Sequence, residues 1–143
     1  MAFNGYFIKI LGSPDYTIPL TYMAEKSYHG VVSTLDKEAY RDGNMKLHRT
    51  AVLQVPHAVF TTRPLNNIEL GEIFRNIQSR YTNVIEKKVN ASVYITELDT
   101  YMNQEFYVPD IDPTIDKIQD GKIKSEPVQI EFIGYGEWWY DKL

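Results

Sequence analysis

Residues 66–97 read NNIELGEIFRNIQSRYTNVIEKKVNASVYITE, and the hydrophobic period changes within this stretch. Its first half has apolar side chains spaced by three and four residues, namely Leu70, Ile73, Phe74, Ile77 and Tyr81. This spacing places them on one stripe of a helix. Residues 88–97 instead alternate apolar and polar side chains, which is the period of a half-buried strand. We therefore expect a helix over about residues 67–82, followed directly by a strand.

The start of this helix has its own signal. Asn66 is a good N-cap residue, and Glu69 follows three positions later, as in a capping box. A surface helix with one apolar stripe usually buries that stripe against its own sheet. We expect the stripe to pack inside the domain and not to bind a partner.

Other strands are predicted from short β-rich runs bounded by turn residues. We expect them at residues 6–11, 17–24, 28–35, 45–55, 58–62, 105–108 and 128–133. Pro19 restricts the second of these to a sheet edge, and Pro56 predicts a break between the fourth and fifth, because proline cannot donate to a ladder. Residues 36–44 are polar and predict a long connection or an exposed hairpin, residues 99–103 a turn, and residues 110–121 an irregular acidic loop.

The order of elements, strands then one helix then strands, favours an α+β, mainly β fold over a doubly wound sheet. We expect an antiparallel β-sandwich flanked by the one amphipathic helix. With 143 residues the chain is long enough for one ordinary core. We assign residues 1–136 to a single domain and residues 137–143 to an aromatic C-terminal tail.

Composition excludes several function classes. The chain is 43% hydrophobic and 24% charged, with a net charge of −4 and scattered basic residues, so nucleic-acid sequence recognition is not expected. It has no cysteine, and no apolar run approaches the length of a membrane span. The N-terminus lacks the features of a signal peptide, so we expect synthesis in the cytoplasm and no membrane association.

Catalytic and metal-binding patterns are not found. His29, His48 and His57 lie on separate segments, and no nucleophile elbow or phosphate-binding glycine pattern occurs. The sequence therefore predicts no enzyme activity, no cofactor and no metal site. Aspartates cluster between Asp110 and Asp120, but the run lacks the spacing of a calcium loop. A solvated acidic loop is favoured there, and whether it binds an ion stays open.

Two segments are candidate interfaces. Trp138, Trp139 and Tyr140 are consecutive, so their rings cannot all face one core. Contact with another chain and folding back over the sheet are equally good explanations, because aromatic residues are enriched in interfaces. Asp42, Gly43 and Asn44 have turn chemistry, and we expect them to be exposed in the free subunit and ordered against a neighbour in an assembly.

Four stretches, residues 40–49, 70–81, 106–110 and 128–135, resemble small tail-module proteins of phages and prophages that infect low-GC Gram-positive bacteria. The resemblance lies in segment order and short motifs across residues 5–136, and it includes tail-tube, distal-tail and tail-terminator proteins of siphophages. It implies a tail-tube-like β-sandwich with one helix and a virion location in the tail or baseplate. It also implies partners that are copies of the chain in a ring, hexameric in that group, and other tail proteins. The group has no catalytic residues to transfer.

An alternative function is a carbohydrate-binding module for host cell-surface glycans. Exposed tyrosine and tryptophan side chains offer an apolar ring with a polar edge, which suits sugars. The 11 tyrosines and 2 tryptophans of the chain motivate this alternative. An enzyme is the least supported reading, because no nucleophile, base and orienting group can be named together.

Overall fold

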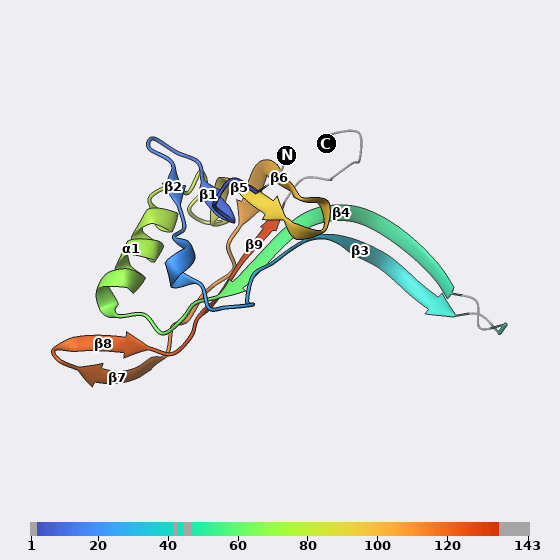
Figure 1. Cartoon of the computed structure of the whole chain (residues 1–143). Coiled ribbons are helices and arrows are strands. Elements are labelled where there is room, and N and C mark those ends of the chain that lie inside the picture. Colours follow the sequence, from blue (N-terminus) through green and yellow to red (C-terminus); the bar gives the residue numbers. More distant parts are fainter. Residues whose placement is uncertain (1–2, 42, 45–46, 135–143) are drawn as a thin grey trace.

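The computed structural model describes residues 3–41, 43–44 and 47–134. These residues form mainly β-structure with one α-helix (Figure 1). The strands are β1 (Ile8–Ile10), β2 (Tyr16–Thr17), β3 (His29–Arg41), β4 (Leu47–Thr61), β5 (Lys88–Ile95), β6 (Thr100–Tyr107), β7 (Ile115–Gln119), β8 (Lys122–Ser125) and β9 (Gln129–Gly134). The α-helix is α1 (Asn67–Gln78), and two short 3₁₀ helices are η1 (Leu20–Tyr22) and η2 (Thr96–Leu98). The predicted α+β, mainly β class with antiparallel pairing and one helix is confirmed.

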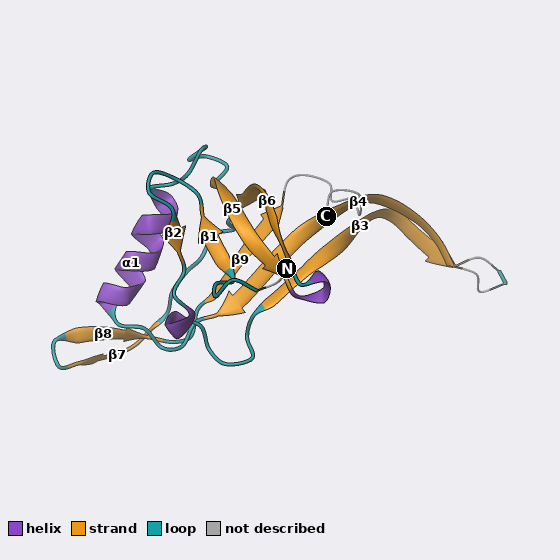
Figure 2. Ribbon diagram, turned by 45° about the horizontal axis from the view of Figure 1, so that its top comes forward, coloured by secondary structure: helices purple, strands orange, loops and turns teal. Residues whose placement is uncertain are grey.

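Seven strands form one antiparallel sheet in the order β2-β1-β5-β6-β9-β4-β3, and β7 and β8 form a separate hairpin (Figure 2). The sheet curls, so that the beginning of β3 meets the end of β5. Tyr28 donates its hydroxyl to the Tyr94 carbonyl at 2.5 Å, and the Val32 N–H donates to Glu97 Oε1 at 2.8 Å. The layers that enclose the core thus come from one curled sheet rather than from two separate sheets.

Helix α1 covers the core as its apolar stripe predicts. Ile73 and Ile77 are buried, and Leu70, Phe74 and Tyr81 pack against them while partly exposed. The helix ends at Gln78, earlier than expected, because the next residues cap its last carbonyls. Ser79 N–H donates to the Arg75 carbonyl, and the Arg80 guanidinium donates to the Asn76 carbonyl at 3.0 Å. Such groups satisfy the free carbonyls at a helix C-terminus.

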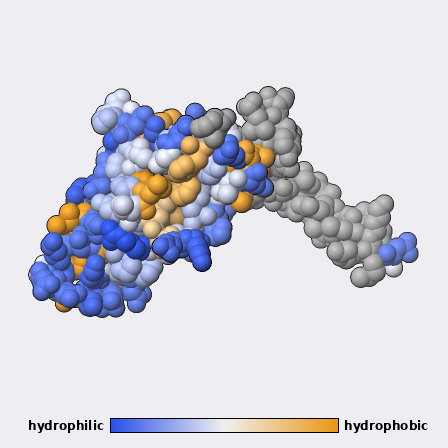
Figure 3. All heavy atoms as spheres, in the orientation of Figure 1, coloured by the Kyte–Doolittle hydropathy of each residue, from blue (hydrophilic) through white to orange (hydrophobic). Residues whose placement is uncertain are grey.

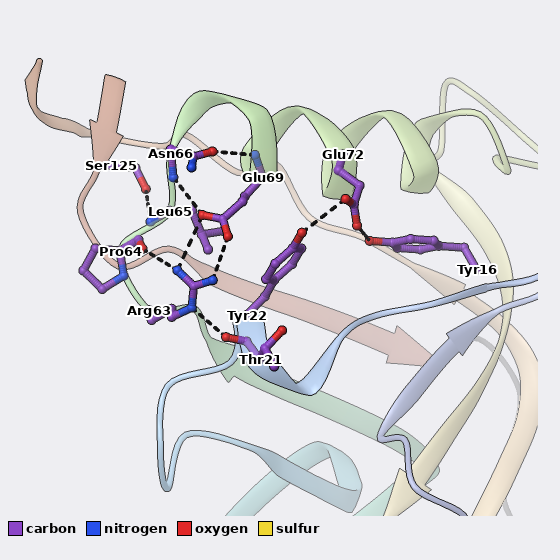
Figure 4. A network of polar contacts seen from close by, with 10 residues as sticks. All are labelled: Tyr16, Thr21, Tyr22, Arg63, Pro64, Leu65, Asn66, Glu69, Glu72 and Ser125. Carbon is purple, nitrogen blue, oxygen red and sulfur yellow. Dashed lines mark hydrogen bonds and ion pairs between the residues drawn. The ribbon is translucent and has the colours of Figure 1, made fainter. Parts of the chain in front are cut away.

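Figure 4 shows the polar network that attaches the other face of α1 to the N-terminal segment. Tyr16 and Tyr22 donate their hydroxyls to the two Glu72 oxygens at 3.0 and 3.2 Å. Burial, together with the bond to Glu72, raises the pKa of the Tyr16 phenol. Beside it, Arg63 binds Glu69 at 2.7 Å. The network fixes β2 and η1 onto the helix.

The predicted capping box is also confirmed. The Asn66 side chain accepts from Glu69 N–H at 2.9 Å, and Glu69 Oε1 accepts from Asn66 N–H at 3.1 Å. The bond from Arg63 holds the pKa of the Glu69 carboxyl below its ordinary value. The charged carboxylate therefore accepts the capping hydrogen bond, pairs with Arg63 and interacts favourably with the positive end of the helix dipole.

Two expectations about β-structure were wrong. Pro56 does not break a strand, because β4 continues through it with Val32 of β3 as its partner. Its missing N–H is tolerated because pairing of β4 with β9 begins only at His57. The segment 17–24 is not one strand either, since it leaves β-structure after Thr17 and then forms η1. For residues 36–44 the sequence left a long connection or a hairpin open, and residues 36–41 belong to a hairpin. They form the outer part of β3 and pair with residues 47–51 of β4, so backbone pairing satisfies a polar segment that shows little apolar patterning.

The acidic segment 110–121 is not irregular throughout. Ile115–Gln119 and Lys122–Ser125 form the β7–β8 hairpin, with Asp120 and Gly121 at its turn. Both turn residues have positive φ, 53° and 73°, as a tight two-residue hairpin turn requires. The turn expected at residues 99–103 is also shorter, because η2 and Asp99 reverse the chain and β6 begins at Thr100.

Candidate interaction surfaces

The longest feature outside the body is a two-stranded ribbon, which we call the arm. It consists of Ser33–Arg41 of β3 and Leu47–Val55 of β4, paired from Ser33 opposite Val55 to Arg41 opposite Leu47. At a rise of about 3.3 Å per residue, nine residues span roughly 30 Å. Figures 1 and 2 show the arm leaving the body and arching away from it.

Both edges of the arm are open among the described residues. β3 pairs only with β4, and β4 gains its second neighbour, β9, at His57, beyond the arm. In a two-stranded ribbon about half of the backbone N–H and C=O groups point outward from the pair. The arm therefore presents unpaired backbone groups along two edges, which is the template to which another strand adds.

The bend of the arm has a cause in its register. Pairing shifts between Leu35 and Asp36 and again between Asp36 and Glu38. The first shift leaves Val52 of β4 as the extra residue, and the second leaves Lys37 of β3. Bulges of this kind bend a ribbon and increase its twist. One bulge on each strand restores the register, so the arm continues as a paired ribbon beyond the bend.

A second surface is an aromatic cluster on the sheet face opposite α1. The Phe7 and Tyr28 rings stack with centroids 4.2 Å apart, and Tyr94 lies 5.9 Å from Phe7. Tyr94 also contacts Tyr101 at 5.3 Å, and Phe3 covers Tyr94 edge-on at 5.5 Å. Because the rings contact one another, few ring faces are left as an open platform for a sugar.

The hydroxyls of this cluster are bonded as well. Tyr94 donates to Asp99 at 2.7 Å, and this bond raises the pKa of the Tyr94 phenol. Burial raises the pKa of the Tyr28 phenol. Tyr101 donates to the Tyr6 carbonyl at 2.7 Å. The raised pKa values keep Tyr28 and Tyr94 neutral at ordinary pH. The hydroxyl bond of Tyr101 and the ring contacts hold the N-terminal segment on β5 and β6.

A hollow of about 390 Å³ opens beside these rings. Its walls come from the residue before β1, from η1 and the segment after it, and from the end of β5 with the start of η2. The apolar lining includes Phe7, Leu20, Met23, Tyr28 and Tyr94. Glu25 and Lys26 also line it. Figure 3 shows apolar surface gathered on the front of the body in this region.

The β7–β8 hairpin is a third surface. Ile118 and Ile123 are cross-strand partners on one face, and Lys117 and Lys124 are partners on the other. Both isoleucines are exposed. The hairpin is attached to the body through β8, where Ser125 N–H donates to the Leu65 carbonyl at 2.8 Å. Within the described residues, β7 has no strand on its outer side.

The residues predicted as interface residues are only partly described. Gly43 and Asn44 lie in the turn at the tip of the arm and are exposed. Asp42, Trp138, Trp139 and Tyr140 lie outside the described residues. The prediction that they contact a neighbouring chain therefore stays a prediction.

Neither a metal site nor a membrane span is found in the part of the chain that the structure describes. It contains no group of three or more histidine, aspartate or glutamate side chains placed to hold a metal ion. Asp110, from the acidic run, instead forms an ion pair with Lys87. No helix within residues 3–41, 43–44 and 47–134 has the length and apolar character to cross a membrane.

Sequence reasoning missed the aromatic cluster and the β7–β8 hairpin as surfaces. A signal for the hairpin was present, because Asp-Gly between two short β-rich runs is typical of a tight turn. The aromatic cluster had no local signal. It forms because the register of β1 on β5, with Ile8 opposite Val93, brings Phe7 beside Tyr94.

Comparison with known proteins gives a family and a structural similarity. The model of a family described as "Family of unknown function (DUF6711)" matches residues 1–135. The tail of an empty GTA particle with C6 symmetry contains a chain that is 14% identical, with a TM-score of 0.49. That similarity covers 94% of this chain and 96% of the other. No curated protein matches the chain.

Proposed function

The chain belongs to a family of unknown function, DUF6711, and we propose that it is a structural subunit of a bacteriophage tail that assembles with copies of itself into a ring. The observation that carries this proposal is the arm. It extends from the body, and among residues 3–41, 43–44 and 47–134 its two strands pair only with each other. Its role is to form an interface with a neighbouring subunit.

The energetics of a two-stranded ribbon support an interface. An isolated hairpin is marginally stable in water, and three or more strands or packing against another element are needed for independent stability. Ordering the 18 residues of the arm, 16 of them paired, also costs backbone entropy. A neighbouring subunit that pairs with an edge of the arm satisfies its outward N–H and C=O groups and offsets this entropy. Proteins use such strand addition for assembly.

The tail assignment rests on the resemblance of residues 40–49, 70–81, 106–110 and 128–135 to phage tail-module proteins. The first of these stretches contains the tip of the arm, and the second contains residues 70–78 of α1 and the three residues after it. In the proposal the ring is hexameric, as in that group, and joins other tail proteins. The subunit is made in the host cytoplasm, resides in the virion tail and has no enzymatic role.

Shortening the arm tests this function. Replacing residues 36–52 by Asn-Gly joins Leu35 to Leu53, which are partners in the native register, through a two-residue hairpin turn. A matched control is Lys122→Ala, at an exposed residue of β8 that lies outside the arm. Sedimentation velocity over a concentration series and electron microscopy measure assembly, and urea unfolding checks the fold.

The proposal expects native protein and Lys122→Ala to form rings of the same size, and the shortened protein to stay monomeric with an intact body. Rings formed equally well by the shortened protein would show that the arm is not the interface. A native protein that remains monomeric at every concentration, alone and with other tail proteins, would overturn the proposed function.

A further inference from the structure

Two of the three most exposed apolar side chains of the described residues are adjacent, in the loop between α1 and β5. Ile85 is 93% exposed and Val84 is 72% exposed. We call the loop of residues 82–87 the knob. Single exposed apolar residues are common on protein surfaces, but two adjacent branched aliphatic side chains at this exposure have almost no contact with their own domain.

The knob is held in one conformation by its own hydrogen bonds. Thr82 N–H donates to the Lys88 carbonyl at 2.8 Å, and Lys88 N–H donates to the Asn83 carbonyl at 3.1 Å. The Asn83 side chain accepts from Glu86 N–H at 3.0 Å and donates to the Glu86 carboxylate at 3.0 Å. Val84 and Ile85 are thus presented on a closed loop. A preordered loop loses little conformational entropy when it binds.

The hollow lies at the other end of β5 and is a concave apolar surface on the same chain. The knob immediately precedes Lys88, the first residue of β5, whereas the hollow is lined by Tyr94 and Thr96 at its end. A cavity of about 150 Å³ is enough to hold a benzene molecule. The hollow, at about 390 Å³, therefore has room for two aliphatic side chains, and its apolar walls match them.

We propose that the knob of one copy inserts Val84 and Ile85 into the hollow of a second copy. The inference rests on the proposed function and names a contact that joins the subunits. Because knob and hollow are different surfaces at opposite ends of one strand, the contact is heterologous. Such contacts form a ring when the rotation between copies closes.

Charges around the two surfaces are compatible with this contact. Glu25 and Lys26 line the hollow, and Glu86 and Lys87 flank the exposed pair on the knob. The hollow and the knob therefore each have one acidic and one basic side chain. Neither surface has a net charge that would repel the other. The apolar centre with charged residues at its margin is the usual arrangement of a protein interface.

Cross-linking tests the contact directly, because the native chain has no cysteine. One protein carries Ile85→Cys and another carries Glu25→Cys. The two are mixed under assembly conditions and treated with a short bismaleimide. The matched control replaces Ile85→Cys by Ile118→Cys, since Ile118 is also highly exposed, at 76%, but lies on β7. The inference expects a cross-linked dimer for positions 85 and 25 and none for positions 118 and 25.

A second measurement uses charge. Ile85→Asp is expected to weaken self-association at least tenfold in sedimentation experiments, because it places a carboxylate in an apolar hollow. Ile118→Asp is expected to change it less than twofold. Ile85 has almost no contact with its own domain, so both variants should fold, and urea unfolding checks this.

The outcomes separate this inference from the proposed function. Rings that form without an 85–25 cross-link, and that tolerate Ile85→Asp, overturn the knob contact and leave the tail-subunit function intact. Absence of any assembly, with no 85–25 product at high protein concentration, overturns both. Equal cross-linking from positions 85 and 118 shows nonspecific contact and also overturns the inference.

Discussion

Replacing Ile73 by alanine should destabilise the body strongly, because Ile73 has no exposed surface and lies at the centre of the α1 stripe. The change removes three carbon atoms, and at about 0.8 kcal/mol per buried methylene the transfer cost is roughly 2.4 kcal/mol. The cavity left behind adds to this, while the better helix propensity of alanine returns a few tenths. We expect a loss of about 3 kcal/mol in the free energy of unfolding.

Ile68→Ala is the matched control, since it is the same change in the same helix at a side chain that is 58% exposed. Its expected cost is below about 1 kcal/mol. Urea unfolding followed by circular dichroism measures both. With a slope of about 1–3 kcal/mol per molar urea, the Ile73 variant should lose about 1–3 M in midpoint. Equal, small losses at both positions would show that α1 does not pack on the sheet through this stripe.

Further predictions concern the sheet closure and the helix cap. Gly30→Ala should cost about 2 kcal/mol or more, because its methyl group would lie 2.0 Å from a main-chain oxygen of β5, whereas Gly43→Ala, with open space around it, should be neutral in urea unfolding. Asn66→Ala removes one half of the capping box and should cost about 1 kcal/mol by the same assay. The pKa of Glu69 is lowered mainly by the hydrogen bond from Arg63, so the stability it contributes is present above its ordinary pKa of 4.5 and is lost as pH falls through the lowered value. The difference in midpoint between native protein and Glu69→Gln should thus be largest near neutral pH and shrink in acid; a constant difference would contradict this.

Features that depend on neighbouring residues in the sequence could be predicted. The stripe from Leu70 to Tyr81 and the Asn66–Glu69 capping box are set by helical spacing alone, and both occur as expected. The alternation in residues 88–97 correctly predicted β5, whose alternate side chains face the core. Each of these features depends only on residues that are close together in the sequence.

Features that depend on pairing were predicted less well. Residues 36–41 are polar, so the sequence could not decide between a long connection and a hairpin, and only the pairing with β4 decides for the hairpin. Pro56 suggested a break, but its consequence depends on which strand lies on its N–H side. Both facts are set by register across the sheet, and register is not visible in a single segment.

The candidate surfaces also divide into features that local sequence predicts and features that depend on the packing of distant segments. The turn at Gly43 and Asn44 was visible from residue type, and the hairpin that carries it was one of two alternatives, but the length of the paired arm was not visible. The hollow joins the residue before β1 with residues from η1 and the end of β5, which are separated by up to about 90 positions in the chain. Its existence depends on the curl of the whole sheet. The sequence shows that the knob residues Val84 and Ile85 are apolar, but it does not show that they are exposed.

The central claim is that the arm pairs with a neighbouring subunit, and amide hydrogen exchange of the free and assembled protein tests it most directly. In the described part of the chain the outward amides of residues 34–41 and 47–54 have no strand partner, so about half of the arm amides should exchange fast in the free subunit. In the assembly these amides should become protected, while the amides of β5, which already pairs on both edges, should change little. Arm amides that exchange equally fast in free and assembled protein would contradict the account.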